Sequence, residues 1–109
     1  MRLIGLATCD KCRSAMRELR ENGVEPVFVD VRQDGVDAAK LALMVSEFGD
    51  ALINRRSTTW RNLSEVERQL PPLDLLARNP TLMKRPVIEH RGRKFLGWDD
   101  AVRDALIAH

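Results

Sequence analysis

The chain has no marked excess of charge of either sign and no long apolar run. Eighteen Lys and Arg side chains face 16 Asp and Glu side chains, so the formal net charge is only +2. Non-specific nucleic-acid binding needs a concentrated basic face, which this balance does not favour. The apolar run Leu3 to Ala7 is too short for a signal-peptide core, and no run approaches the length of a membrane span. We therefore expect no direct nucleic-acid partner, no membrane partner and a cytoplasmic location.

Cysteine is also scarce, with only Cys9 and Cys12 among 109 residues. Cytosolic thiols are kept reduced, so this pair is not expected to be a structural disulfide. A Cys-x-x-Cys pair in such a protein indicates catalysis, metal binding or redox sensing. Structural zinc takes about four ligands, and His90 and His109, the two histidines, do not have knuckle spacing. The sequence therefore favours redox chemistry, with no metal and no bound cofactor.

The first third of the chain predicts a βαβ unit. A short buried strand covers residues 2–7, and Pro26 precedes a β-branched strand over residues 27–31. Between them, apolar residues recur at helical spacing at Cys12, Ala15, Met16 and Leu19. Asn22-Gly23 provides a stop for this helix. The two strands are expected to be parallel, with a right-handed crossover.

The middle of the chain predicts helices and the last third a hairpin. Asp37 can cap a helix to about Phe48, with an inward stripe of Leu41, Met44, Val45 and Phe48. Ser64-x-x-Glu67 matches a capping box for a helix to Leu70, Pro71-Pro72 predicts a break, and residues 74–77 predict another short helix. Residues 87–90 and 93–96 flank a two-residue turn, and a closing helix carries Trp98, Ala101, Val102, Ala105 and Leu106.

These elements predict an α/β fold with a four-stranded mixed sheet flanked by helices, which is the thioredoxin arrangement. The length fits one domain over residues 1–109. Within it, a helical insertion over approximately residues 36–80 separates the βαβ half from the ββα half.

The chemistry is predicted where the first strand meets the first helix. A thiolate at a helix N-terminus is stabilised by the free backbone N–H groups, which lowers the pKa of the thiol. Lys11 and Arg13 act in the same direction, whereas Asp10 opposes them. Cys9 is therefore the predicted nucleophile. Cys12 either resolves a mixed disulfide on Cys9 or, because it falls on the apolar stripe, is a core residue.

Two further segments carry candidate residues. Pro86 precedes a predicted strand, a position that suits a cis peptide bond, and Arg85 beside it could pair with an anion held over Cys9. The alternative is a surface arginine before a loop proline. Arg56 lies in the Arg55-Arg56 loop, and it can take part in the site only if that loop folds back toward Cys9. Trp60 is either a core residue, which we favour, or a stacking surface.

Three segments, residues 8–13, 51–63 and 79–87, occur in an order and spacing that resembles the arsenate-reductase-like (ArsC/Spx/YffB) family. The middle segment and the short length look most like the YffB branch of glutathione-dependent thiol reductases. The resemblance implies a thioredoxin-like fold with a helical insertion and attack on substrate by Cys9. It also implies that Arg85 belongs to the site beside a cis Pro86, and that Arg56 approaches from the insertion.

Two departures qualify this resemblance. Glutathione-dependent arsenate reductases use an arginine just after the final hairpin strand, where this chain has Leu96-Gly97-Trp98. Arsenate reduction is therefore less favoured than reduction of a disulfide or a glutathionylated thiol. Cys9-x-x-Cys12-Arg13 instead matches the Spx branch, a redox-switch regulator that binds RNA polymerase through its α subunit.

The sequence therefore predicts a thiol-dependent oxidoreductase. Its catalytic residues would be Cys9, Cys12 and Arg85, and its substrate-binding residues Arg13, Arg56 and Pro86. Glutathione is the expected co-substrate, glutaredoxin the other expected thiol partner, and the substrate a small anion or thiol. The Spx-like regulator is the alternative.

Overall fold

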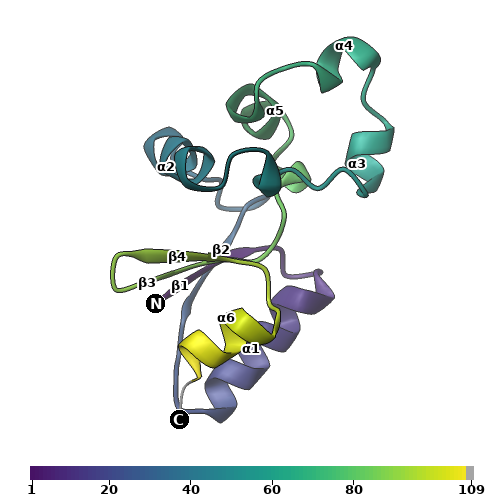
Figure 1. The fold of residues 1–109 in the computed structure, drawn as a ribbon. Coiled ribbons are helices and arrows are strands. Elements are labelled where there is room, and N and C mark those ends of the chain that lie inside the picture. Colours follow the sequence, from purple (N-terminus) through teal and green to yellow (C-terminus); the bar gives the residue numbers. More distant parts are fainter. Residues whose placement is uncertain (108–109) are drawn as a thin grey trace. The chain divides into compact units, whose positions relative to one another are not determined.

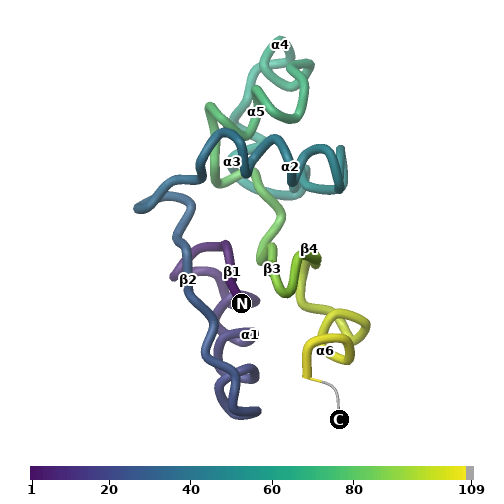
Figure 2. The backbone as a smooth tube through the Cα atoms, turned by 90° about the vertical axis from the view of Figure 1, so that its left-hand side faces the viewer, coloured from purple at the N-terminus to yellow at the C-terminus, as the bar shows by residue number. Residues whose placement is uncertain are grey.

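The structure, a computed structural model, describes residues 1–107. His109, considered above as a zinc ligand, lies outside the described residues. The chain forms two compact units: unit 1 is Met1–Asp34 with the chain from Arg85 onward, and unit 2 is Gly35–Lys84. Figure 2 follows the backbone out of unit 1 after its second strand and back into it at the third. That residues 1–109 act as a single domain stays a prediction.

Unit 1 contains the predicted four-stranded mixed sheet (Figure 1). Its strands are β1 (Arg2–Gly5), β2 (Val27–Asp30), β3 (Val87–His90) and β4 (Arg93–Leu96), in the order β2-β1-β3-β4. β1 is parallel to β2 and antiparallel to β3, and β3 is antiparallel to β4. In this register Ile4 lies opposite Val87, so the start of β3 lies beside the end of β1.

The helices α1 (Asp10–Glu21) and α6 (Asp100–Leu106) of unit 1 cover the same side of the sheet (Figure 1). The predicted apolar stripe of α1 is buried, and it packs with Leu3, Ile88 and Val102. One carboxylate oxygen of Glu18 on α1 accepts hydrogen bonds from Trp98 Nε1 and Arg103 Nε, both at 2.8 Å. This charged contact fastens the C-terminal helix to the first one.

Several predicted boundaries differ from the observed ones. β1 ends at Gly5 instead of residue 7, because the Ala7 N–H donates to the Asp30 carboxylate instead of a neighbouring strand. Trp98 lies before α6 and not inside it, since the side chain of Asp99 caps this helix by accepting from Val102 N at 2.9 Å. The two-residue hairpin turn is confirmed.

Unit 2 is helical. Its elements are α2 (Ala38–Phe48), η1 (Gly49–Leu52), α3 (Thr58–Arg61), α4 (Glu65–Arg68), α5 (Pro72–Arg78) and η2 (Pro80–Leu82). Asp37 caps α2, and Ser64 with Glu67 forms both hydrogen bonds of the capping box. The predicted break lies between α4 and α5, and α5 begins at Pro72, earlier than predicted, because the first helical position needs no N–H donor. The core of the unit is aliphatic: Leu41, Met44, Leu52, Ile53, Leu75, Leu76, Leu82 and Met83.

The helices of residues 1–107 include none with the length and apolar character needed to cross a lipid bilayer.

Candidate active site

Cys9 occupies the N-cap position of α1, at the junction with β1. The chain turns there because Cys9 N donates to Leu6 O at 3.1 Å, and Cys9 O accepts the first helical hydrogen bond from Arg13 N at 3.0 Å. The extended backbone of Cys9, with φ −82° and ψ 123°, is typical of an N-cap residue. Its sulfur is therefore placed at the end of the helix that carries free N–H groups and partial positive charge.

The surroundings of Cys9 favour its ionised form. Burial is the largest single influence and raises the pKa of Cys9, but the other interactions outweigh it. They are the backbone N–H of Cys12, the neighbouring side chains of Arg85 and Cys12, and the positive charge of Arg85. Within residues 1–107 the sulfur makes no side-chain cap hydrogen bond to the helix. The net result is a pKa below that of an ordinary thiol.

Cys12 has the opposite character. It is completely buried, and burial raises the pKa of the Cys12 thiol to about 12, with the nearby charge of Cys9 adding to the effect. The backbone N–H of Leu6 acts in the other direction without compensating. The pair therefore combines a thiol whose pKa is lowered, Cys9, with a neighbouring thiol whose pKa is raised, Cys12. Nucleophilic attack by a thiolate needs this division of roles.

The sheet explains how Arg85 meets Cys9 from the other end of the chain. Because β3 begins beside the end of β1, the residues before β3 lie next to the loop that leads into α1. The Arg85–Pro86 peptide bond is cis, and the buried Pro86 is held by a hydrogen bond from Gly97 N to Pro86 O at 2.8 Å. Arg85 is half-buried. The structure thus brings Cys9, Cys12 and Arg85 together.

The loop before Cys9 has a support that the sequence did not reveal. Asp30, at the end of β2, is buried and accepts a hydrogen bond from Ala7 N at 3.1 Å. Its other carboxylate oxygen accepts from Gln33 N at 3.0 Å and from Arg32 N at 2.8 Å. These N–H groups, Gln33 first, lower the pKa of Asp30. Asp30 therefore ties the active-site loop to the end of the neighbouring strand.

The other candidate arginines are placed differently. Arg13 is exposed and forms an ion pair with Asp10 on the same helix. Arg56 lies in unit 2, exposed, in a turn where its backbone N–H donates to Asn54 Oδ1 at 3.0 Å. It is not among the groups that unit 1 gathers around Cys9.

Trp60, which we favoured as a core residue, is only half-buried. The guanidinium groups of Arg55 and Arg68 lie over its ring, at 5.2 and 5.4 Å from the centroid. The ring is thus a stacking surface for two arginines of its own unit, the interpretation that the sequence made second.

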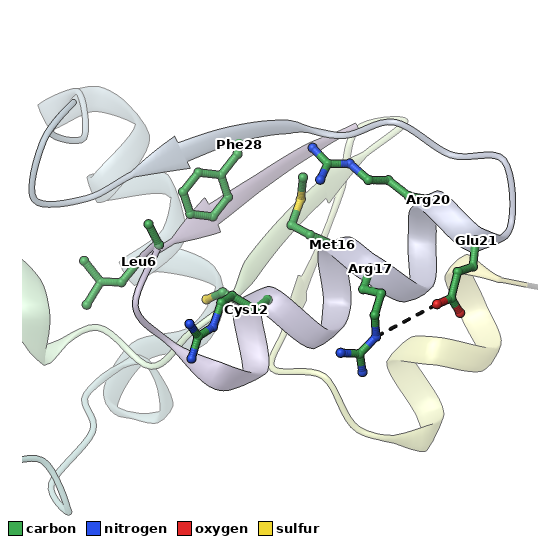
Figure 3. A pocket seen from close by; sticks show the side chains of 9 residues that line it. Leu6, Cys12, Met16, Arg17, Arg20, Glu21 and Phe28 are labelled. Carbon is green, nitrogen blue, oxygen red and sulfur yellow. Dashed lines mark ion pairs between the residues drawn. The ribbon is translucent and has the colours of Figure 1, made fainter.

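A groove of about 500 Å³ runs along α1 beside β2, and Cys12 forms part of its wall (Figure 3). Leu6, Met16 and Phe28 line its apolar side. On the helical side, Arg17 pairs with Glu21 at 3.9 Å. The groove is therefore a mainly apolar hollow with an ion pair at its edge.

A mixed four-stranded sheet with a cysteine pair at the mouth of its first helix and a cis proline before β3 defines a thioredoxin-like fold. A model of the ArsC family matches residues 5–105, and the chain belongs to this family. An uncharacterized protein of Haemophilus influenzae is 39% identical over 109 residues, 95% of this chain and 96% of its own length. The expected relationship to the ArsC/Spx/YffB group is confirmed.

Two further comparisons fall on different branches of the family. The solved structure of a YFFB protein has a TM-score of 0.89 and 32% identity, with 97% of each chain covered. The global transcriptional regulator Spx 1 of Oceanobacillus iheyensis is 29% identical over 106 residues, 91% of this chain and 81% of its own length. The chain thus has the thiol-reductase-like fold of its family, and its relatives include a transcriptional regulator.

Proposed function

We propose that this chain is a thiol-dependent reductase that uses glutathione as its reductant, with glutaredoxin as an alternative thiol partner. The observation that supports it most directly is the position of Cys9 at the N-cap of α1, where Arg85 and Cys12 lower the pKa of its thiol. A guanidinium beside a thiolate stabilises that thiolate, and it also attracts an anionic substrate to the sulfur. The expected substrates are a disulfide, a glutathionylated thiol or, less favoured, an oxyanion.

The reaction proceeds by two thiol–disulfide exchanges. The Cys9 thiolate attacks one sulfur of a disulfide R–S–S–R′, the S–S bond breaks, and R′–S⁻ leaves and takes a proton from water. Cys12 then gives its proton to water, and its sulfur attacks the Cys9 sulfur of the mixed disulfide and releases R–S⁻. Two molecules of glutathione reduce the Cys9–Cys12 disulfide and leave as glutathione disulfide. In the alternative second step, glutathione itself attacks the Cys9 adduct.

The charge state of Cys9 determines when Cys12 can act as the second nucleophile. The negative charge of Cys9 is one cause of the raised pKa of Cys12. Once Cys9 is part of a mixed disulfide, this charge is gone and ionisation of Cys12 becomes easier. Cys12 therefore becomes a better nucleophile only after the first exchange.

Substrate binding is assigned to the remaining candidates. Arg13 would pair with a carboxylate of a glutathione moiety, since guanidinium groups bind carboxylates through two hydrogen bonds. Arg56 is proposed as a substrate-binding residue of unit 2. Pro86 would present the extended backbone beside Cys9. Arg13 must leave its exposed ion pair with Asp10 to do so, and exposed pairs of this kind are worth only about 0–1 kcal/mol.

Turnover with glutathione and a glutathionylated peptide tests the proposal, with Cys9→Ser, Cys12→Ser and Glu21→Ala compared with the unmodified chain. We expect no activity for Cys9→Ser and reduced activity with an accumulating Cys9 adduct for Cys12→Ser. Activity should be near normal for Glu21→Ala, which changes an exposed residue at the other end of α1. Full activity of Cys9→Ser would exclude the proposed chemistry.

A second candidate function is a redox-switch regulator that binds RNA polymerase. It is supported by the similarity to Spx 1 together with the Cys9-x-x-Cys12-Arg13 motif. In this case the Cys9–Cys12 disulfide would change affinity for a protein without catalytic turnover. Binding of the purified RNA polymerase α subunit to the reduced and the oxidised chain decides: redox-dependent binding supports the regulator, and absence of binding in both states removes it.

A further inference from the structure

Gly5 differs from the other glycines of the chain in what surrounds it. Within the described residues, a Cβ built on any of the other five would meet no atom within 4 Å, and all five have positive φ, where glycine is favoured for its backbone. Gly5 is a strand residue without a positive φ, so its backbone conformation suits any residue. A Cβ at Gly5 would lie 2.3 Å from Cys12 Sγ. Glycine is therefore required at position 5 because a side chain there would collide with Cys12.

The atom that fills this space is the sulfur of the buried thiol. Cys12 is completely buried, and its sulfur interacts with the backbone N–H of Leu6, directly after Gly5. The same thiol also interacts with Cys9 and lowers the pKa of the nucleophile. The buried sulfur of Cys12 thus lies against Gly5 at the end of β1 and also influences Cys9.

We propose that Gly5 is a positioning residue for the cysteine pair: the side chain that it lacks leaves the space for Cys12 Sγ, and this keeps Cys12 within reach of an adduct on Cys9. The chemical consequence rests on the proposed reductase function. With Gly5 present, Cys12 resolves the Cys9–S–S–R adduct, forms the Cys9–Cys12 disulfide and releases R–SH. With a side chain at position 5, an external thiol such as glutathione must attack instead and leave as a disulfide with R.

The sulfur of Cys12 has few alternative positions in the packed core. A distance of 2.3 Å between carbon and sulfur is far below contact distance, so Gly5→Ala must rotate the Cys12 side chain or separate the helix from the strand. One of the three χ1 rotamers is rare in helices, which limits rotation, and the close-packed core resists separation. Either change moves the thiol out of its contact with Cys9.

Cys12→Ala supplies the matched control, because it removes the atom that collides. The distance from the built Cβ to Cys12 Cβ is 3.4 Å, an ordinary contact, so Gly5→Ala should be tolerated when residue 12 is alanine. The experiment therefore compares four proteins: the unmodified chain, Gly5→Ala, Cys12→Ala and the double variant. Each is measured for its thermal unfolding midpoint and for the alkylation pKa of Cys9.

Gly5→Ala is expected to lower the unfolding midpoint in the unmodified background and to have little effect in the Cys12→Ala background. Gly5→Ala and Cys12→Ala should each raise the pKa of Cys9, and the double variant should show no further rise. A loss of stability without this pattern of pKa changes would indicate a merely structural glycine and overturn the proposal. If Gly5→Ala does not fold, folding of the double variant supports the proposal, and failure of both to fold overturns it.

The products formed in a glutathione redox buffer report the consequence for catalysis. Mass spectrometry should show the Cys9–Cys12 disulfide in the unmodified chain and the Cys9–glutathione adduct in Gly5→Ala. The ratio of the two should change by about tenfold or more, as expected for an overpacked core contact. An unchanged ratio would overturn the proposal. The unmodified chain could lack turnover while the unfolding midpoints and Cys9 pKa values of the four proteins change as expected. In that case the reductase function fails and the role of Gly5 stands.

Discussion

The side chain of Arg85 lies near enough to Cys9 to lower the pKa of its thiol, although the two residues lie in the last and first thirds of the chain. The antiparallel pairing of β1 with β3 makes this contact available, since it sets the residue pair before β3 beside the loop before α1. The thiolate therefore receives support from the helix end and from a cation.

Replacement of Arg85 should weaken the stabilisation of the Cys9 thiolate. Arg85→Ala is expected to raise the pKa of Cys9, because the neighbouring positive charge is lost, and therefore to slow alkylation of Cys9 at neutral pH. Arg85→Lys should restore part of the effect through its charge. Arg17→Ala is the control, since Arg17 is an exposed arginine farther along α1 that pairs with Glu21. An equal change in both alanine variants would argue against a specific role of Arg85.

The loop support by Asp30 predicts a pH-dependent contribution to stability. Backbone N–H groups hold the pKa of Asp30 below its ordinary value, so its carboxylate stabilises the folded chain above the unfolded pKa of about 3.9. This contribution is lost as pH falls through the lower, folded value. Asp30→Asn should therefore reduce the unfolding midpoint at pH 7, and the difference should close in acid. A difference that is constant from pH 7 to pH 3 would contradict the assignment.

The contact of Glu18 with Trp98 and Arg103 predicts a role in anchoring α6. Glu18→Ala removes both 2.8 Å hydrogen bonds and should lower the free energy of unfolding by about 1–3 kcal/mol. Glu21→Ala, which breaks only an exposed 3.9 Å pair with Arg17, should cost less than about 1 kcal/mol. Urea denaturation of both variants makes the comparison, and equal losses would show that the contact does not anchor the helix.

The adjacent arginines of unit 2 should separate into two roles. Arg55 lies over Trp60 and pairs with Asp50 at 3.6 Å, so Arg55→Ala is expected to affect stability. Arg56 is exposed, and under the proposed function Arg56→Ala should raise KM for a glutathionylated peptide and leave the unfolding midpoint unchanged. Steady-state kinetics and thermal unfolding distinguish the two variants. An unchanged KM for Arg56→Ala would remove it from the substrate-binding residues.

Much of unit 1 could be predicted because its signals are local. The cysteine pair at a strand–helix junction, the stripe from Cys12 to Leu19 and the Arg91-Gly92 turn each depend on residues close in sequence. Both turn residues have positive φ, 51° and 76°, as a tight hairpin of this kind requires. Local patterns of this type specify elements, and the parallel βαβ rule then specifies their arrangement.

The rest depends on contacts between distant residues. No pattern in the sequence indicates that Asp30 accepts from Ala7, that Glu18 bonds Trp98, or that Gly5 faces Cys12, because each needs the sheet register and the helix orientation together. α3 was also missed, since its four residues are too few for a periodic signal. The role of Arg56 stays a prediction, because it belongs to the other unit.

The pH dependence of alkylation at the two cysteines, followed by peptide mass spectrometry on the unmodified protein, tests the central claim most directly. The reaction at Cys9 should reach half its maximal rate below about pH 8.5, the value of a free thiol, while Cys12 stays unmodified in the folded chain. A midpoint for Cys9 at or above that value, or a faster reaction at Cys12, would contradict a stabilised thiolate at the mouth of α1.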